Sequence, residues 1–304
     1  MEKKKAITCL KPSDGGLHFG HYIGNIEPLI KYQDDFECYF IFSDLQMINL
    51  GNKFDVLENI YDMMKQMIAL GVDPNKVIFG RESIVKEKRL NDLIAISNYL
   101  SNTRIDRLPL FKSIEKPYKM SMYLYPLLQA LDFYMTDAEI AFSNTDNKPA
   151  IELINELFAK MNHLEGRSLK HIELIHGVVD FLVGVDGEKM SKAKGNAIFL
   201  SDSCNEISKK VNKMYTDPLK IHADSPGHVE GNVVFQFFKA FLSNEEYWRL
   251  CDDYEKGKLP DRKAKAELVQ ILNDIAKKSK TCNYSITTLN EILIRGEKRM
   301  LYHI

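Results

Sequence analysis

The sequence predicts an α/β protein, in which a Rossmann-like parallel sheet forms the first domain and a mostly helical second domain follows. Two observations support this prediction. In the first half, short β-rich apolar runs alternate with segments of helical periodicity, which is the pattern of a parallel sheet with crossover helices. From about residue 203 onward, one helical pattern follows another. We therefore expect a first domain over residues 1–202 and a helical domain over residues 203–304.

The expected elements of the first domain follow in chain order. Three apolar runs are predicted strands, AITCL at 6–10, ECYFIFSDL at 37–45 and NKVIFG at 75–80. HYIGNIEPLIKYQ is expected to form the helix after the first strand. In the next helix, apolar side chains recur at spacings of three and four up to Gly71, a plausible helix stop: Leu57, Ile60, Tyr61, Met64 and Ile68. Ligands of such sheets bind beyond the carboxyl ends of the strands, so the loop at 11–20 is expected at a binding site.

The second domain is expected to consist of helices separated by turn-rich connections. Residues 216–232 are rich in turn residues and are the expected linker before the main helical part. The predicted helical segments are 205–215, 233–257, 262–280 and 286–300. No internal repeat or low-complexity tract interrupts them.

Composition restricts the class of protein. The 304 residues are 45% hydrophobic, and the formal net charge is −1, so no overall cationic field indicates a nucleic-acid partner. The five cysteines are scattered without a Cys-x-x-Cys pair, which is typical of reduced thiols. No apolar run approaches the roughly 18 residues of a membrane span, and the amino-terminal segment lacks the apolar stretch of a signal peptide. We expect a cytoplasmic protein that does not enter a membrane.

Two separated motifs indicate a site for a phosphate-bearing ligand. In GGLHFGHYIG, His18 and His21 flank Gly20 near the start of a helix, where backbone amides and the helix dipole favour an anion. In VDGEKMSKAKGN, at 185–196, three lysines lie between two glycines. The composition of this second segment would also suit a solvated surface turn. The presence of both motifs in one chain favours a glycine-hinged cationic loop that closes over phosphates.

These residues resemble the signature motifs of class I aminoacyl-tRNA synthetases. His18-x-Gly20-His21 resembles the HIGH motif, and residues 189–193, KMSKA, resemble the KMSKS loop with alanine in the last position. The chain is most similar to tryptophanyl-tRNA synthetases, through segments such as ALGVDPNKVIF, RLPLFK, YPLLQALD, KKVNKMYTDP and SPGHVEGNVVFQFFKAF. Tyrosyl enzymes share the architecture. The resemblance implies activation of an amino acid, with tryptophan the first candidate, by ATP and Mg²⁺, transfer to tRNA, an anticodon-binding-like second domain that ends early, and a homodimer.

The resemblance also implies the residues that would handle ATP. His18 and His21 would donate to the phosphates, Lys189 and Lys192 would close over them, and Lys112 would contact a phosphate unless it is an exposed surface lysine. No protein ligand to a metal is expected. The remaining expected ATP contacts are Lys11, Pro12, Ser13, Gly20, Asn144, Thr145, Asp146, Met190, Ser191 and Ala193.

The amino acid is expected to bind along one helix face. Tyr125, Gln129 and Asp132 fall at positions i, i+4 and i+7 and so share that face. Polar side chains on an otherwise apolar helix require partners, either a substrate or one another. In tryptophanyl enzymes this aspartate accepts the indole N–H, whereas in tyrosyl enzymes a Tyr-x3-Gln-x2-Asp pattern holds the amino group and the phenol. The other expected contacts are Thr8, Gln46 and Asn147.

Departures from the family pattern keep other functions open. Gln46 replaces a histidine, Asn144 a glycine, Asn147 a glutamine, and Lys11 stands where a glutamine is common. A tryptophan–tRNA ligase is the first hypothesis. A paralogue that activates tyrosine or a non-standard amino acid, or supplies another pathway, is the second. A non-catalytic binding or regulatory paralogue is the third. Small nucleotidyltransferases share His-x-Gly-His, but they are shorter and lack the lysine loop.

Overall fold

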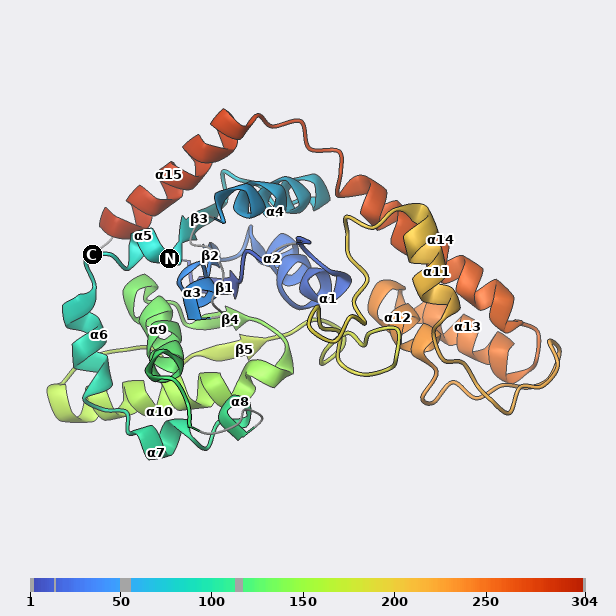
Figure 1. Ribbon diagram of the computed structural model, residues 1–304, viewed down its shortest axis with the longest axis horizontal. Coiled ribbons are helices and arrows are strands. Elements are labelled where there is room, and N and C mark those ends of the chain that lie inside the picture. The colour runs from blue at the N-terminus through green and yellow to red at the C-terminus, as the bar shows by residue number, and fades with distance from the viewer. Residues whose placement is uncertain (1–2, 14, 50–55, 113–116, 303–304) are drawn as a thin grey trace.

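The computed structural model describes residues 3–13, 15–49, 56–112 and 117–302 (Figure 1). Its centre is a five-stranded parallel sheet in the order β3-β2-β1-β4-β5. The strands are β1 Lys5–Leu10, β2 Glu37–Phe42, β3 Val77–Arg81, β4 Ile140–Phe142 and β5 Glu173–Ile175. The predicted fold class, a parallel sheet surrounded by helices, is therefore confirmed.

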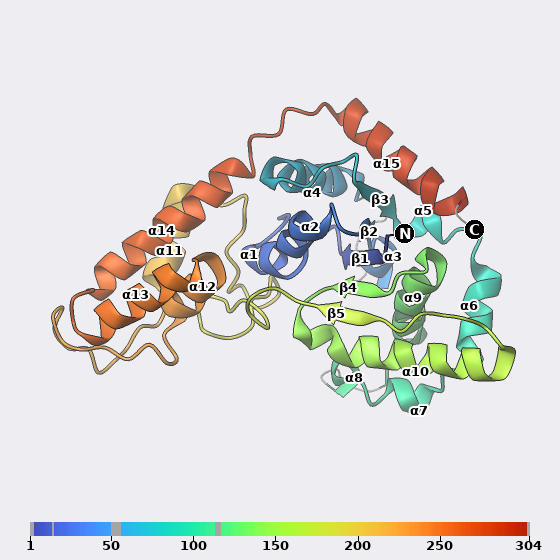
Figure 2. The ribbon, with the colours of Figure 1, turned by 180° about the vertical axis from the view of Figure 1, so that it is seen from behind.

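Alternating side chains of the strands divide the core between the two faces of the sheet. Phe40 and Phe42 lie in one apolar cluster, while Tyr39 and Ile41 lie in the other. The first cluster also includes side chains of η1, α2 and α4, and the second includes side chains of α9 and α10. Figures 1 and 2 show α4 on one side of the sheet and α9 and α10 on the other. Because both faces are covered, the central strands β1 and β2 are mostly apolar.

The helices of the sheet region include short and irregular ones. The helix expected at 21–33 begins earlier and has three parts, α1 Phe19–His21, the π-helical segment η1 Tyr22–Ile26 and α2 Glu27–Tyr32. α4, Leu57–Leu70, ends as predicted at Gly71, whose φ of 130° suits glycine. The others are α3 Leu45–Asn49, α5 Glu82–Val85, α6 Leu90–Ser97, α7 Asn102–Ile105, α8 Pro109–Lys112, α9 Met120–Thr136, η2 Thr145–Asn147 and α10 Lys148–Glu165.

A group of helices extends to one side of the sheet (Figure 1). It comprises α11 Cys204–Asn212, α12 Val233–Phe241, α13 Asn244–Glu255 and α14 Asp261–Lys278. The segment expected to be helical over 233–257 divides at Ser243, which forms a capping box with Glu246 and starts α13. α14 packs against both α11 and α12. None of the helices in the described residues is long and apolar enough to cross a membrane.

The last helix, α15 Ile286–Tyr302, returns to the sheet and lies against β3, α4 and α5. Gly296 permits this contact, because a Cβ atom there would lie 2.0 Å from the carbonyl oxygen of Phe79. Arg81 at the end of β3 pairs with Glu297, with Nε 2.5 Å from Oε1 and Nη2 3.0 Å from Oε2. The segment expected as one helical domain over 203–304 thus has its last helix on the sheet.

Candidate active site

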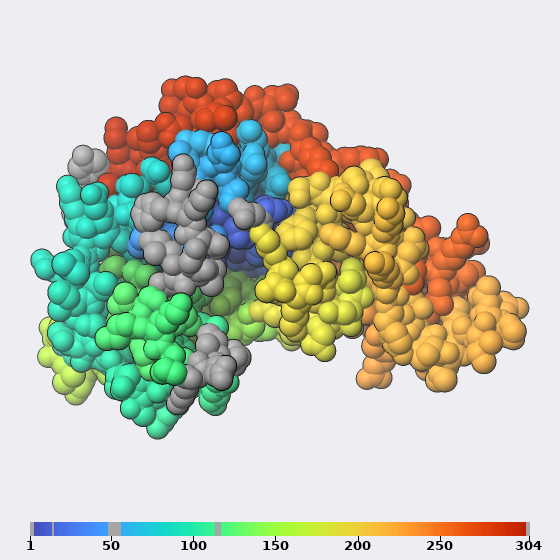
Figure 3. Space-filling view, viewed as in Figure 1, coloured from blue at the N-terminus to red at the C-terminus, as the bar shows by residue number. Residues whose placement is uncertain are grey.

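A cavity of about 960 Å³ lies at the carboxyl ends of β1, β2 and β4. Both motifs contribute to its wall, the first through His18, Gly20 and His21 and the lysine loop through residues 189–194. Figure 3 shows the segment around residues 180–230, in yellow-green to yellow, at the surface beside the blue amino-terminal segment. The structure therefore brings together the two motifs that the sequence analysis paired, and the volume suits a nucleotide-sized ligand.

Most of the predicted site residues line this cavity. The lining includes Thr8, Lys11, Ser13, His18, Gly20, His21, Gln46, Tyr125, Gln129, Asp132, Asn144, Asp146, Asn147, Lys189, Met190, Ser191, Lys192 and Ala193.

Three predicted residues do not line the cavity. Pro12 is buried, and its carbonyl accepts a hydrogen bond from the side chain of Asn59. Thr145 is directed to the neighbouring loop, where its N–H and Oγ1 both donate to the carbonyl of Asp180. Lys112 is the exposed last residue of α8, whose preceding Phe111 is buried. This position matches the alternative of a surface lysine rather than the expected phosphate contact.

The two histidines of the first motif hold each other in place. His18 caps α1: its Nδ1 accepts the backbone N–H of His21 at 3.2 Å, and its own N–H donates to Nδ1 of His21 at 3.5 Å. The two rings stack with centroids 3.5 Å apart. Because both Nδ1 atoms act as acceptors, each neutral ring carries its proton on Nε2. Each ring can therefore donate one hydrogen bond from Nε2.

Electrostatics keep both rings neutral. Burial, assisted by the positive charge of Lys189, lowers the pKa of His18 to about 4. Burial also lowers the pKa of His21 well below its usual value, with further contributions from His18 and Lys189. At neutral pH the pair therefore offers hydrogen-bond donors without positive charge, and the cationic groups of the site are lysines.

Gly20 is required by this stack of rings. A Cβ atom on Gly20 would lie 3.0 Å from both Cε1 and Nδ1 of His18 and 3.6 Å from Cβ of Met190. Any larger residue would displace the His18 ring or the lysine loop. The first motif thus needs glycine for its own packing, in addition to the close approach of a ligand that the sequence suggested.

The lysine loop is a hairpin held from inside by Asn196. This side chain is 3% exposed; its Oδ1 accepts from the N–H of Ser191 at 2.8 Å, and its Nδ2 donates to Asp186 Oδ1 at 2.8 Å and to the carbonyl of Lys189 at 3.2 Å. A Cβ atom on Gly184 would lie 2.4 Å from Cγ of Asn196. Asn196 is not among the predicted site residues, although an asparagine directly after the second glycine of the loop is a recognisable turn signal.

Lys189 reaches from this loop to the opposite wall of the cavity. Its ammonium group forms an ion pair with Asp146, which follows β4 at η2. Lys194, further along the loop, lies 3.7 Å from Glu188. The lysine loop is thus attached to the residue that the resemblance assigned to the ribose, and the ion pair closes one side of the cavity.

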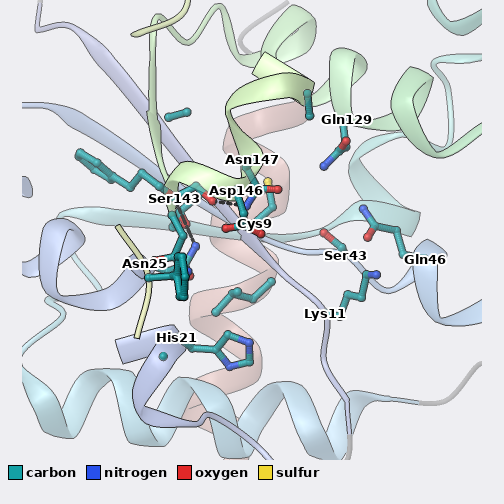
Figure 4. Close-up of a pocket in the computed structure, with 18 of the residues that line it drawn as sticks. Cys9, Lys11, His21, Asn25, Ser43, Gln46, Gln129, Ser143, Asp146 and Asn147 are labelled. Atoms are coloured by element: carbon teal, nitrogen blue, oxygen red, sulfur yellow. Dashed lines mark hydrogen bonds between the residues drawn. The ribbon is translucent and has the colours of Figure 1, made fainter. Parts of the chain in front are cut away.

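Polar side chains from three elements face the other end of the cavity (Figure 4). Gln129 Nε2 lies 3.5 Å from the hydroxyl of Tyr125, one turn earlier on α9. Lys11 Nζ lies 5.2 Å above the ring of Tyr125, and burial lowers the pKa of this lysine. Gln46 on α3 is 4% exposed and lines the same end. This end can therefore bind a small polar or zwitterionic ligand.

Asp132 forms the floor of this end and has a partner that the sequence analysis missed. Two buried residues lie directly behind Asp132: Glu82, the first residue of α5, and Lys86, which follows the helix. Their spacing of four residues at the carboxyl end of β3 was the available signal. Asp132 therefore has a partner beyond Tyr125 and Gln129, the other two polar residues on this face of α9.

The substituted asparagines are part of the wall near β4. Asn144 packs over Gly24 of η1, where a Cβ atom would lie 2.2 Å from its Oδ1. Asn147 donates from Nδ2 to Ser143 Oγ at 2.7 Å. A further asparagine, Asn25, lines the cavity from η1 and donates to Thr8 Oγ1 at 2.8 Å; the sequence analysis did not identify it. Single π-helical turns are frequent at functional sites.

Comparisons with known proteins agree with this geometry. Residues 2–277 match the family described as tRNA synthetases class I (W and Y). The tryptophan–tRNA ligase of Borreliella burgdorferi is 36% identical over 291 residues, covering 91% of this chain and 82% of the relative. That of Chlamydia caviae is 32% identical and covers 99% of this chain and 92% of the relative.

Solved structures share the fold. The tryptophanyl-tRNA synthetase of Campylobacter jejuni, in complex with ADP and tryptophan, has a TM-score of 0.77 at 24% identity, covering 98% of this chain and 95% of that one. The tyrosyl-tRNA synthetase of Archaeoglobus fulgidus, in complex with L-tyrosine, has a TM-score of 0.76 at 23% identity, with 91% and 89% covered. With the family match, the two converging motifs and this shared fold, the chain belongs to the class I tRNA synthetases of the tryptophan and tyrosine group.

Proposed function

We propose that this protein activates tryptophan with ATP to form tryptophanyl-adenylate and then transfers the aminoacyl group to tRNA. The observation that carries the proposal is the convergence of His18, His21 and residues 189–194 on one cavity whose other end is formed by Tyr125, Gln129 and Asp132. One end suits a triphosphate and the other suits an amino acid, so the two substrates would meet at the carboxyl ends of the strands.

The reaction requires orientation and charge stabilisation. In the first step, a carboxylate oxygen of the amino acid attacks the α-phosphorus of ATP, and the bond to the β-phosphate oxygen breaks to release pyrophosphate. Neutral His18 and His21 would donate from Nε2 to phosphate oxygens, and Lys189 and Lys192 would balance the charge on the leaving group. In the second step, a ribose hydroxyl of the tRNA attacks the carbonyl of the adenylate, and AMP leaves.

Lys189 would have to leave Asp146 and contact a phosphate in the first step. In the structure it is paired with Asp146. Bound ATP would offer phosphate oxygens to Lys189 and ribose hydroxyls to Asp146. Mg²⁺ would accompany ATP as part of the substrate complex.

A second candidate is activation of tyrosine or another amino acid by the same chemistry. Gln129 supports it, because Tyr125, Gln129 and Asp132 reproduce the Tyr-x3-Gln-x2-Asp pattern that the resemblance ascribes to tyrosyl enzymes. Gln46, in place of a histidine, also changes the wall of this end. A non-catalytic role is the weaker candidate, since the cationic and imidazole groups of both motifs are retained around a single cavity.

The proposal includes the partners and compartment that accompany this activity. The helices from residue 203 onward would form the tRNA-contacting second domain, and two copies of the chain would form a homodimer in the cytoplasm. Size-exclusion chromatography with light scattering tests the dimer, and a filter-binding assay with total tRNA tests the nucleic-acid partner.

Amino-acid-dependent ATP–pyrophosphate exchange across the twenty standard amino acids tests the activity. Exchange with tryptophan alone supports the proposal, and exchange with tyrosine or another amino acid supports the second candidate. Absence of exchange with all twenty would refute both for standard substrates. Lys192→Ala should lower the exchange rate by at least about 100-fold if the lysine stabilises the leaving group. A loss below threefold would remove Lys192 from the mechanism.

A further inference from the structure

The floor of the amino acid end is a buried ion network that no motif of the chain indicated. Lys86 Nζ lies 2.6 Å from Glu82 Oε1, 2.7 Å from the carbonyl oxygen of Leu128 and 2.8 Å from Asp132 Oδ1. The side chains of Lys86, Glu82 and Asp132 are 3%, 0% and 2% exposed. Two hydrogen bonds, to Glu82 and Leu128, and the ion pair with Asp132 hold the ammonium group of Lys86 inside the network.

The network presents only one of its members to the cavity. Asp132 lines the cavity, whereas Lys86 and Glu82 are absent from its wall. Asp132 Oδ1 faces Lys86, and the described contact of Oδ2 is the weak S–H donor of Cys9, with Sγ 3.9 Å away. Oδ2 is therefore available to accept a strong hydrogen bond from a ligand.

Charge determines the protonation state of that oxygen. Burial raises the pKa of Glu82 to about 7 and also raises the pKa of Asp132. Burial alone would lower the pKa of Lys86, but the two carboxylates outweigh it and raise that pKa. The positive charge of Lys86, 2.8 Å from Asp132 Oδ1, favours the ionised form of both carboxyl groups and opposes the effect of burial. A carboxylate is an acceptor only.

We propose that Lys86 is a specificity-determining positioning residue, which holds Asp132 Oδ1 and so directs Oδ2 into the cavity as an acceptor, with the result that the site selects an amino acid whose side chain ends in an N–H or O–H donor. This inference rests on the proposed amino acid activation. A site built to hydrogen-bond a donor rejects the isostere that lacks it by about 10⁴–10⁵-fold, because the buried acceptor is left unpaired. Lys86 acts here through Asp132, without touching the substrate.

The test compares tryptophan with 3-benzothienylalanine, in which sulfur replaces the indole N–H. ATP–pyrophosphate exchange is measured with both amino acids on the full-length unmodified protein, Lys86→Met and Lys88→Met. Lys88 is an exposed lysine two positions along the chain and provides the matched control. We expect Lys86→Met to lose at least about tenfold of the kcat/KM preference for tryptophan, with the KM for ATP unchanged and Lys88→Met like the unmodified protein.

A pH profile separates this role from a merely structural one. Without Lys86, the pKa of Asp132 rises further, so in Lys86→Met the KM for tryptophan should fall as pH rises and the acceptor ionises. The groups that face Asp132 or its neighbours in the network, and that could contribute to the profile, are Cys9 on β1, Tyr125 on α9, Glu82 on α5 and, through Glu82, Asp44 and Lys11.

Each outcome decides the inference. If Lys86→Met does not fold, Glu82→Gln/Lys86→Met removes the second buried charge and is measured in its place. A folded variant that keeps the full preference and a flat pH profile overturns the inference while the proposed function stands. If the unmodified protein uses tyrosine, phenylalanine becomes the isostere and the same ratio decides. If it prefers an amino acid without a donor, the inference falls and amino acid activation stands; absence of all exchange removes both.

Discussion

Removal of the Asn196 side chain is the most direct test of how the lysine loop contributes to activity. Asn196 makes three hydrogen bonds from inside the hairpin, to Ser191, Asp186 and Lys189. It does not line the cavity itself. Asn196→Ala therefore leaves the lysines in the chain and removes only the hydrogen bonds that order the hairpin around them.

The expected loss of activity in Asn196→Ala follows from the three hydrogen bonds that the variant lacks. At about 0.5–1.5 kcal/mol for each hydrogen bond, the ordered hairpin loses about 2–4 kcal/mol. Each 1.36 kcal/mol in an activation barrier corresponds to about tenfold in rate, so amino-acid-dependent pyrophosphate exchange should fall by up to about 30- to 1,000-fold. Because the lost contacts lie within one surface hairpin, we expect the melting temperature to change by only a few degrees.

Exchange rates and thermal melting of Asn196→Ala are compared with those of Asn205→Ala. Asn205 is an exposed asparagine on α11, so its removal controls for the substitution alone. A rate within threefold of the unmodified protein would refute the reasoning, since it would mean that the hairpin needs no internal brace. A large fall in melting temperature would instead make Asn196 part of the global fold.

Three further predictions concern stability. Glu297→Ala removes the carboxylate that pairs with Arg81, whose side chain is 22% exposed, and should lower the free energy of unfolding by about 1.5–3 kcal/mol in urea titrations; a change below about 0.5 kcal/mol would contradict the pairing. Gly296→Ala places a methyl group against the carbonyl of Phe79 and should destabilise still more, so a variant that melts with the unmodified protein would place α15 elsewhere. The pKa of His18 is about 4 in the folded chain and about 6.5 when unfolded, so its contribution is present above pH 6.5 and is lost as pH falls toward 4. The stability advantage over His18→Asn should therefore shrink by about 2–3 kcal/mol between pH 7.5 and 4.5, and parallel pH curves would exclude it.

The local sequence pattern was enough to predict strands that contain a continuous run of buried apolar residues. β1, β2 and β3 are five or six residues long, and their runs of aromatic and β-branched residues read directly as buried strands. β4 and β5 have three residues each, too few to separate from the helices beside them. The amphipathic pattern of α15 indicates that one face is buried, but it does not indicate which surface receives that face.

The site residues also divide into those that a local motif predicts and those that only the fold brings together. The motif residues were predictable because their chemistry is concentrated in short segments, and His18, His21 and Lys189 line one cavity. Lys86 and its contact with Asp132 join positions far apart in the chain, and no local pattern contains such a contact. Lys112 shows the limit of a matching segment, since the structure leaves this residue exposed outside the cavity and its phosphate contact stays a prediction.

The ion pair between Lys189 and Asp146 explains how a cationic loop can lie over a site before its substrate arrives. The positive charge of Lys189 contributes, after burial, to the low pKa of His18. Asp146 offsets that charge, and both partners are partly exposed, at 46% and 35%, so separating them costs little. In the proposed reaction, ATP would supply a new partner for each group, phosphate for Lys189 and ribose hydroxyls for Asp146. ATP binding would then replace one set of contacts with another of similar strength. The net stabilisation would arise in the transition state, as the leaving pyrophosphate develops its full charge.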